Sequence, residues 1–169
     1  MIYYTSDTHF NHANIIRYCN RPFKSVNGMN HEMIKRWNEV VNPEDTVFHL
    51  GDFAMGMYSV WPNFCQALNG RKILILGNHD RKREKMLAVG FHEVYDSISH
   101  EGWLLVHNPI GLIGKVLCGH VHDKWRRHHD EKRDIINVGV DVHNFYPVTL
   151  EQLLKVPYDA QTKDFYSMH

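Results

Sequence analysis

The sequence predicts an α/β fold in which two packed mixed β-sheets are flanked by helices, and two observations lead to it. Short runs rich in β-branched and aromatic residues alternate with segments of helical period in the first half of the chain. In the second half, strand-like runs follow one another with few helices between them. Such elements bury their apolar sides by stacking in layers. With 169 residues, we predict a single domain over residues 1–169.

The first half predicts alternating strands and helices. One segment has apolar residues at helical spacing, which are Met33, Ile34, Trp37, Val40 and Val41. Asn42-Pro43 ends that helix, and Gly90 ends a later one. The predicted strands are 2–5, 46–50 and 72–76, and the predicted helices are 30–41, 58–68 and 81–89.

The second half predicts further strands. Two runs, 91–98 and 103–106, read as strands joined by a tight link over 99–102. The segments 115–118 and 135–138 predict two more short strands, and 149–156 predicts a short helix. Because these strands do not alternate regularly with helices, we expect a mixed rather than a purely parallel sheet.

Composition excludes several classes of protein. Lys+Arg and Asp+Glu both total 19, so net charge does not indicate a nucleic-acid or acidic-lipid partner. No stretch approaches the roughly 20 apolar residues of a membrane span, and the first residues lack the pattern of a signal peptide, so we expect a cytoplasmic location. The three cysteines are widely spaced, as expected in a reducing compartment. The 14 histidines are unusually many, and histidine is the commonest metal ligand.

Residues that can bind metals follow five of the predicted strands. They are Asp7 and His9, then Asp52, then Asn78, His79 and Asp80, then His107, and finally His120 and His122. Sites in α/β sheets gather at the carboxyl ends of strands, so these side chains are expected to converge. In each pair two residues apart, both side chains face the same way if the backbone is extended. Gly51, Gly77 and Gly119 fit sharp turns or close backbone approaches.

These blocks resemble the signature of the calcineurin-like metallophosphoesterase family. The chain has "DTH" at 7–9, "GD" at 51–52, "GNHD" at 77–80, a lone histidine at 107 and "GHVH" at 119–122, in the family's order. The resemblance implies two sheets packed face to face between helices, the four-layer metallophosphoesterase sandwich. It also implies a dinuclear metal site at the strand ends.

The resemblance also implies a role for each residue. One metal ion is expected at Asp7, His9 and His122, and the other at Asn78, His107 and His120. Asp52 is expected to bridge both ions. His79 is expected above the scissile phosphate as a catalytic residue, with Asp80 orienting its ring.

Simpler interpretations of some of these residues stay open. Asp80 precedes a predicted helix, so it fits the role of an N-cap as well as that of an orienting residue. Asp7 and Asp52 are also possible helix caps. Asn78 can be explained by turn formation alone, and His107 by a strand end.

The ligand types suit hydrolysis by metal-activated water. Histidine, aspartate and asparagine without cysteine favour Mn, Fe, Zn, Ni or Co. Two such ions can generate a bridging hydroxide that attacks phosphorus, and His79 can assist the leaving group. We expect a phosphodiesterase in preference to a phosphomonoesterase, acting on a small phosphoester such as a cyclic or short nucleotide. Extended nucleic acid is not expected. The alternative is a protein-interaction module that keeps the fold without catalysis, and the oligomeric state is not predicted.

Several residues outside the blocks are candidates for substrate contact. Asn11, His12 and Arg17 closely follow the first block. Arg81 lies one step beyond the turn at 77–80, where it can bind a phosphate oxygen or simply lie on a solvated helix face. His143 is a candidate for the pocket rim.

Overall fold

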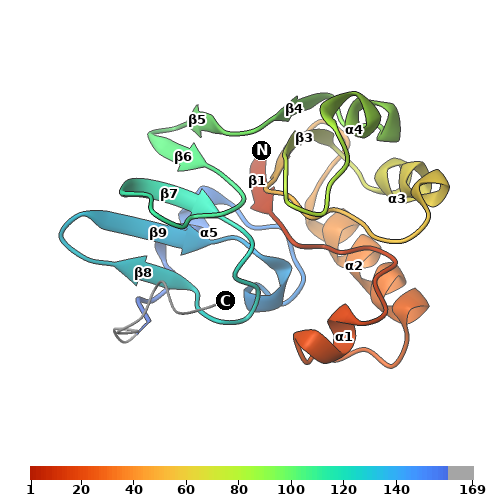
Figure 1. The fold of residues 1–169 in the computed structure, drawn as a ribbon, viewed down its shortest axis with the longest axis horizontal. Helices are drawn as coiled ribbons and strands as arrows, with labels where there is room; N and C mark the ends of the chain where they lie inside the picture. The colour runs from red at the N-terminus through yellow and green to blue at the C-terminus, as the bar shows by residue number, and fades with distance from the viewer. Residues whose placement is uncertain (160–169) are drawn as a thin grey trace.

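The computed structural model describes residues 1–159, which form two β-sheets side by side with α2, α3 and α4 along the outer side of the first (Figure 1). The α/β fold class with two sheets flanked by helices is therefore confirmed. The predicted domain runs to residue 169, and its last part, 160–169, lies outside the described residues.

In contrast to the prediction of two mixed sheets, the first sheet is entirely parallel. It has the order β1-β2-β3-β4, with β1 at Ile2–Thr5, β2 at Thr46–His49, β3 at Arg71–Ile75 and β4 at Glu93–Tyr95. Thr5 pairs with His49, and His49 pairs with Leu74, so the carboxyl ends of the first three strands are level. The loops that leave these strands therefore start from one edge.

The second sheet is mixed, with the order β5-β6-β7-β9-β8. Its strands are β5 (Ile98–His100), β6 (Trp103–Leu105), β7 (Gly114–Cys118), β8 (Arg127–His129) and β9 (Arg133–Asn137). The central strands β6, β7 and β9 are parallel, and an antiparallel strand closes each edge. This mixed pattern agrees with the prediction from the second half of the sequence.

Two predictions for this half were wrong in detail. The run predicted as one strand over 91–98 is divided between β4 of the first sheet and β5 of the second. The chain passes between sheets here, and the link to β6 is a tighter turn in which Glu101 and Gly102 have φ of 49° and 81°. The edge strand β8 was not predicted.

The helices begin and end where their caps dictate. They are α1 (Ile15–Tyr18), α2 (Val26–Val40), α3 (Trp61–Ala67), α4 (Arg83–Val89) and α5 (Leu150–Leu154), with 3-10 turns at Tyr58–Val60 and Val140–Val142. The Ser25 side chain accepts a hydrogen bond from the Gly28 amide, so α2 starts four residues earlier than predicted. Gly90 ends α4 in the left-handed conformation, as predicted. Helix α1 was not predicted.

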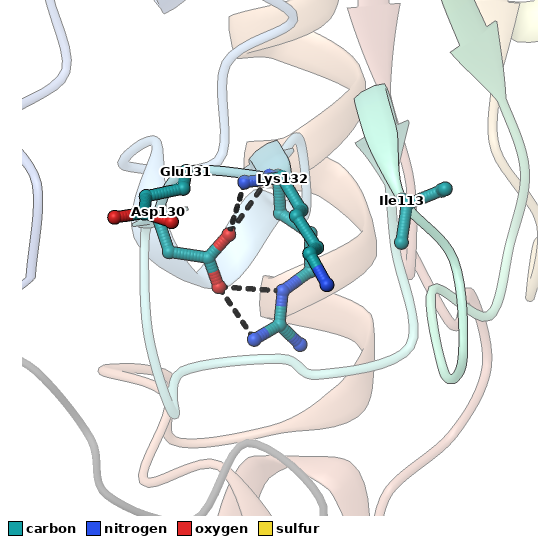
Figure 2. A pocket seen from close by; sticks show the side chains of 5 residues that line it. Ile113, Asp130, Glu131 and Lys132 are labelled. Carbon is teal, nitrogen blue, oxygen red and sulfur yellow. Dashed lines mark hydrogen bonds and ion pairs between the residues drawn. The ribbon is translucent and has the colours of Figure 1, made fainter.

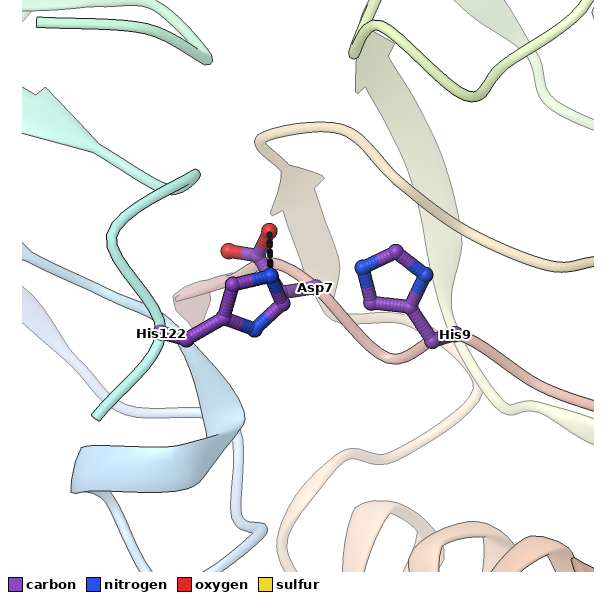
Figure 3. A group of neighbouring side chains, drawn as sticks. All are labelled: Asp7, His9 and His122. Carbon is purple, nitrogen blue, oxygen red and sulfur yellow. Dashed lines mark ion pairs between the residues drawn. The ribbon is translucent and has the colours of Figure 1, made fainter. Parts of the chain in front are cut away.

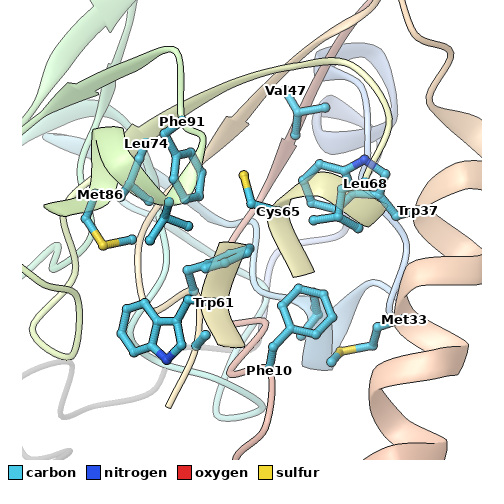
Figure 4. Close-up of a cluster of buried hydrophobic side chains, with 14 of the residues drawn as sticks. Phe10, Met33, Trp37, Val47, Trp61, Cys65, Leu68, Leu74, Met86 and Phe91 are labelled. Carbon is cyan, nitrogen blue, oxygen red and sulfur yellow. The ribbon is translucent and has the colours of Figure 1, made fainter. Parts of the chain in front are cut away.

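Alternating side chains bury both faces of each sheet. In the first sheet Val47 and Leu74 face a cluster shared with α2, α3 and α4, which includes Trp37, Trp61 and Met86 (Figure 4). Their neighbours in the strands face a second cluster, between the two sheets. Burial on both faces explains why these strands read as continuous apolar runs.

The two sheets meet at the carboxyl ends of their parallel strands. Ser6, just after β1, forms a parallel bridge with Gly139, just after β9. The Asp7 amide donates to the Gly51 carbonyl at 2.9 Å, which joins the loops after β1 and β2. Loops from both sheets therefore converge on one region. None of the helices within residues 1–159 combines the length and apolar composition needed to cross a membrane.

Candidate metal centre

The first group of converging side chains is Asp7, His9 and His122 (Figure 3). Their potential donor atoms all lie within 4.8 Å of one another. Asp7 and His9 come from the loop after β1, whereas His122 comes from the loop after β7 in the other sheet. The junction of the sheets thus brings together ligands separated by more than 100 residues.

The second group is Asn78, His107 and His120. The Asn78 Oδ1 atom lies 2.9 Å from His107 Nε2 and 3.1 Å from His120 Nδ1. The two ring nitrogens are 3.3 Å apart. Three loops, after β3, β6 and β7, therefore point three donor atoms at one place.

Asp52 lies between the two groups. Its Oδ2 atom is 3.5 Å from His9 Nε2 and 3.4 Å from His107 Nε2. The structure thus brings together all seven side chains predicted as metal ligands, with Asp52 where a shared ligand would have to be.

Strained backbone holds several of these residues. Asp7, His9, Asp52, His120 and His122 have φ between 47° and 72°, in the left-handed region that residues other than glycine rarely adopt, so the pairs 7/9 and 120/122 do not lie on the extended backbone considered above. Such conformations each cost of order 1–3 kcal/mol and concentrate at functional sites. Gly77 and Gly119 allow the close approach, because a Cβ on Gly77 would overlap Asp52 and one on Gly119 would overlap Ser6. This confirms the role predicted for these glycines.

Hydrogen bonds orient the histidine rings toward the centre. His107 donates from Nδ1 to the Leu50 carbonyl at 2.8 Å, which leaves Nε2 facing Asp52 and Asn78. His122 donates from Nδ1 to the Asp141 carboxylate at 3.1 Å, and its Nε2 lies 3.9 Å from Asp7 Oδ1. A hydrogen bond on one ring nitrogen fixes which nitrogen can bind a metal.

His9 is the clearest indication that a cation belongs here. Both of its ring nitrogens are buried, and neither has a hydrogen-bond partner among the described residues. An unsatisfied buried polar group costs free energy that a bound cation would recover. Burial is the main cause that lowers the pKa of His9 to about 2, so its ring is neutral, as a metal ligand must be.

The buried carboxylates supply the matching negative charge. Asp7 and Asp52 are both almost fully buried. Burial alone would raise the pKa of Asp52, but the hydrogen bond and charge of His107 hold it below its ordinary value. Burial likewise opposes the charge on His107, yet the interactions with Asp52 and Asp7 raise its pKa to about 9. The proton on His107 therefore balances the Asp52 carboxylate, and a divalent cation can take over that role.

His79 stands at the rim of the cluster. Its side chain is 46% exposed, and its Nε2 atom lies 4.0 Å from Asp52 Oδ2. Its backbone amide donates to Asp52 Oδ1 at 2.9 Å, which fixes the turn while leaving the ring accessible. The ring centroid is 5.6 Å from that of His9.

Asp80 has neither of the two orientations predicted for it. Its carboxylate accepts hydrogen bonds from the amides of Asp52 at 2.9 Å, Phe53 at 3.0 Å and Gly77 at 2.8 Å. It does not cap α4, whose N-cap is Lys82 without a side-chain hydrogen bond. Asp80 therefore joins the loops after β2 and β3, because three amides at that junction need an acceptor.

Of the residues predicted to contact substrate, some lie next to the ligand cluster and others do not. The His12 ring lies 5.5 Å from that of His9, next to the cluster. The Asn11 amide donates to Asn30, and the exposed Arg17 bonds to Asn14 at 3.3 Å. Arg81 is exposed but precedes α4, and its guanidinium lies 5.7 Å from the Trp61 ring centroid, so it is not on the helix face that was predicted as the alternative. His143 donates to the Asn137 carbonyl at 2.7 Å and lines a cavity with Asp141.

Three supporting residues were missed by the sequence analysis. Asp141 binds His122 and Arg21, and Arg21 in turn donates to the carbonyls of Asp7 and Thr8. His49 donates to the Thr8 hydroxyl at 2.9 Å. The position of His49 at the end of a strand was the only signal available, and Arg21 and Asp141 belong to no recognised block.

Open space borders the second group. A groove of about 480 Å³ is lined by Asn78, His107 and His120 together with Leu76, Val106, Gly77, Asp96 and Asn108. Another hollow, of about 450 Å³, lies at the β8–β9 turn, where Arg133 pairs with Asp130, and includes none of the ligand cluster (Figure 2). A small molecule can therefore reach the second group through the first of these two spaces.

The chain is similar over most of its length to several known proteins. The chain is 40% identical to an uncharacterized protein of Methanocaldococcus jannaschii over 170 residues, covering 92% of this chain and 90% of that protein. It is 38% identical to the gene 66 protein of Mycobacterium phage D29, covering 87% of this chain and 92% of that protein. A solved structure of a protein of unknown function from Aquifex aeolicus superposes with a TM-score of 0.72 at 32% identity, covering 92% of this chain and 98% of that one.

The family model that matches is that of the calcineurin-like phosphoesterases, over residues 1–161. The match spans both sheets and every loop that contributes to the ligand cluster. The chain belongs to the calcineurin-like phosphoesterase family.

Proposed function

We propose that the protein is a phosphodiesterase that uses two divalent transition-metal ions to hydrolyse a small phosphoester. The observation that carries this proposal is the pair of ligand groups that share Asp52. Two groups of donors around one carboxylate suit a pair of neighbouring cations better than a single one.

The residues fit such ions by their chemistry. Asp7, His9 and His122 would hold one ion, Asn78, His107 and His120 the other, and Asp52 would serve both. The donors are nitrogen and oxygen atoms of intermediate hardness, which suit Mn, Fe, Zn, Ni or Co. When bound, such ions activate water for attack on phosphorus and stabilise the charge on phosphate oxygens.

The chain's own groups complete the chemistry. His79 presents an accessible imidazole beside the shared carboxylate, so it can donate a proton to the departing oxygen. Asp80 supports that role indirectly, because it holds the turn that carries His79 against the loop of Asp52. His12 lies beside His9 and is placed to contact a substrate oxygen.

The groove favours a small substrate. It combines apolar walls from Leu76 and Val106 with the polar side chains of Asn108 and Asp96, a lining suited to an organic group that donates hydrogen bonds. A neutral chain lacks the excess positive charge that tracks an extended nucleic acid. We therefore propose a compact phosphodiester, such as a short or cyclic nucleotide, as the substrate class.

The test is a matrix of metals and substrates. Chelator-treated protein is loaded with Mn, Fe, Zn, Ni or Co and assayed with bis-p-nitrophenyl phosphate, p-nitrophenyl phosphate, and 2′,3′- and 3′,5′-cyclic nucleotides. We expect metal-dependent turnover, faster with diesters than with the monoester. Turnover of the monoester alone would contradict the diesterase preference. No turnover with any ion would favour a protein-interaction module instead.

A further inference from the structure

Arg21 and Asp141 form a buried ion pair beside the first ligand group. Their side chains are 0% and 2% exposed. Arg21 Nε lies 2.7 Å from Asp141 Oδ1, and Arg21 Nη2 lies 3.0 Å from Asp141 Oδ2. Both residues come from connecting segments, Arg21 from the link between α1 and α2 and Asp141 from the turn after β9. Because removing two charges from water is costly, the presence of such a pair is weak evidence that it stabilises the fold.

The same guanidinium also holds the loop that carries Asp7 and His9. Arg21 Nη2 donates to the Asp7 carbonyl at 2.7 Å, and Nη1 donates to the Thr8 carbonyl at 3.0 Å. Asp7 and His9 both have left-handed backbone conformations, so their loop needs external support. The planar five-donor guanidinium can meet these acceptors together, which an ammonium group cannot do with the same geometry.

The Arg21–Asp141 pair also orients the ring of His122. Asp141 Oδ2 accepts the His122 Nδ1 proton at 3.1 Å, so Nε2 remains for the group of Asp7 and His9. Arg21 thus acts on every member of the first ligand group, directly through the loop of Asp7 and His9 and through Asp141 on His122.

A competing set of donors shares His122. Cys19, His122 and Asp141 also place potential ligand atoms within 4.8 Å of one another. In the structure both Asp141 oxygens are engaged by Arg21, and His122 Nδ1 is engaged by Asp141. An ion bound at this second set would need an Asp141 oxygen and a ring nitrogen of His122, so it would compete with Arg21 for Asp141 and with the first group for His122.

We propose that the Arg21–Asp141 pair is a positioning device that assigns His122 to the first ion and prevents Cys19, His122 and Asp141 from capturing a thiophilic ion. The pair is not itself a ligand. This inference rests on the proposed function only in requiring that the first group binds a divalent cation.

The experiment is a titration of chelator-treated full-length protein with cobalt(II) chloride, followed by absorption spectroscopy and elemental analysis. In Arg21→Met we expect the first cobalt ion to bind about tenfold to a hundredfold more weakly than in the wild type. We also expect a near-ultraviolet band from cobalt–thiolate charge transfer, absent from the wild type and lost again when Cys19→Ser is added.

Arg127→Met is the matched control. Arg127 makes the same kind of two-contact pair with Asp134, at 2.8 Å for both contacts, and its side chain is 7% exposed. It lies on β8, outside the ligand cluster. Loss of this pair should lower the thermal stability in a similar way and leave cobalt affinity and spectrum unchanged.

The proposal would be overturned if Arg21→Met kept wild-type cobalt affinity, showed no thiolate band and lost as much stability as Arg127→Met. The ion pair would then have only a structural role. If Arg21→Met does not fold, Arg21→Lys replaces it. Lysine keeps the charge and loses the planar fork, so weakened cobalt binding supports the proposal and wild-type binding overturns it. A wild type that binds no cobalt, zinc or manganese would instead refute the proposed function.

Discussion

The two ligand groups differ in how deeply they are buried and in how firmly other residues hold their side chains in place. In the first group Asp7 is fully buried, His9 is 2% exposed and His122 is 21% exposed. In the second group Asn78 is exposed and His120 is half-buried, and both line an open groove. The Arg21–Asp141 pair braces the first group on two sides, whereas the ring of His107 is held by a single backbone carbonyl.

This difference suggests unequal tasks. A pre-organised buried site loses little freedom when an ion binds, so it should bind tightly and exchange slowly. In the proposed enzyme, the more open group would be the one that substrate reaches through the groove. Because Asp52 touches both groups, its loss should affect both.

The largest effect is expected from Asp52→Asn. The substitution removes the shared negative charge, so both groups should lose affinity, and turnover of bis-p-nitrophenyl phosphate should fall by roughly three to four orders of magnitude. Elemental analysis and steady-state kinetics measure the two losses. Asp130→Asn, at the β8–β9 turn, is the control and should behave as wild type. Full metal content with normal turnover in Asp52→Asn would show that the carboxylate is not shared.

His79→Ala should separate chemistry from metal binding. Because His79 lies at the rim and its ring is 46% exposed, we expect turnover to fall by about 10²–10⁴-fold while the bound metal is unchanged. The loss should be smaller for a p-nitrophenyl ester than for an alkyl ester, since p-nitrophenolate departs without a proton.

The control for His79→Ala is His31→Ala, an exposed histidine on α2. It should retain wild-type turnover with both esters. A loss of metal in His79→Ala, or an equal loss of rate with both leaving groups, would contradict the role of His79 as the acid.

The comparison between the groups is tested directly by His9→Ala and Asn78→Ala. His9→Ala should weaken the tightly bound ion by about ten- to a hundredfold, whereas Asn78→Ala should weaken only the ion that a chelator removes first. Timed removal of metal by a chelator, followed by elemental analysis, distinguishes them. Identical release curves for the two variants would show that the groups are equivalent.

The metal-ligand residues could be predicted because each lies in a short sequence pattern that is recognisable by itself. The ligands follow strands directly, and the glycines that permit their approach are adjacent to them, so each block is recognisable without knowing its neighbours. The parallel strands of both sheets then bring the blocks together, because their carboxyl ends face one region.

The residues that were missed or misassigned interact with partners far away in the sequence. Arg21 and Asp141 are 120 residues apart, and no spacing rule connects them. Asp80 bonds to amides 27 and 28 residues away, so the local alternatives of orienting His79 or capping α4 were both wrong. The strand predicted over 91–98 contains no glycine or proline to mark where the chain leaves one sheet for the other.

The smallest effect is expected from Asp80→Asn, which leaves every proposed ligand in place. The amide keeps the volume of the carboxylate but turns one acceptor into a donor facing a backbone N–H, which should lower the free energy of unfolding by about 1–3 kcal/mol. Because Asp80 holds Gly77 next to Asn78 and also accepts from the amide of the shared Asp52, the loosely bound ion should weaken by less than about tenfold, and the buried ion by less still.

Urea unfolding and the chelator assay measure these two quantities for Asp80→Asn. Asp45→Asn provides the comparison, since Asp45 is 3% exposed and accepts a hydrogen bond from the Asn42 amide at the amino end of β2. It should lose stability to a similar degree and retain both ions. If Asp80→Asn instead released the buried ion first, the loop of Gly77 would support the first group, and the division of the cluster into a braced and an open half would be wrong.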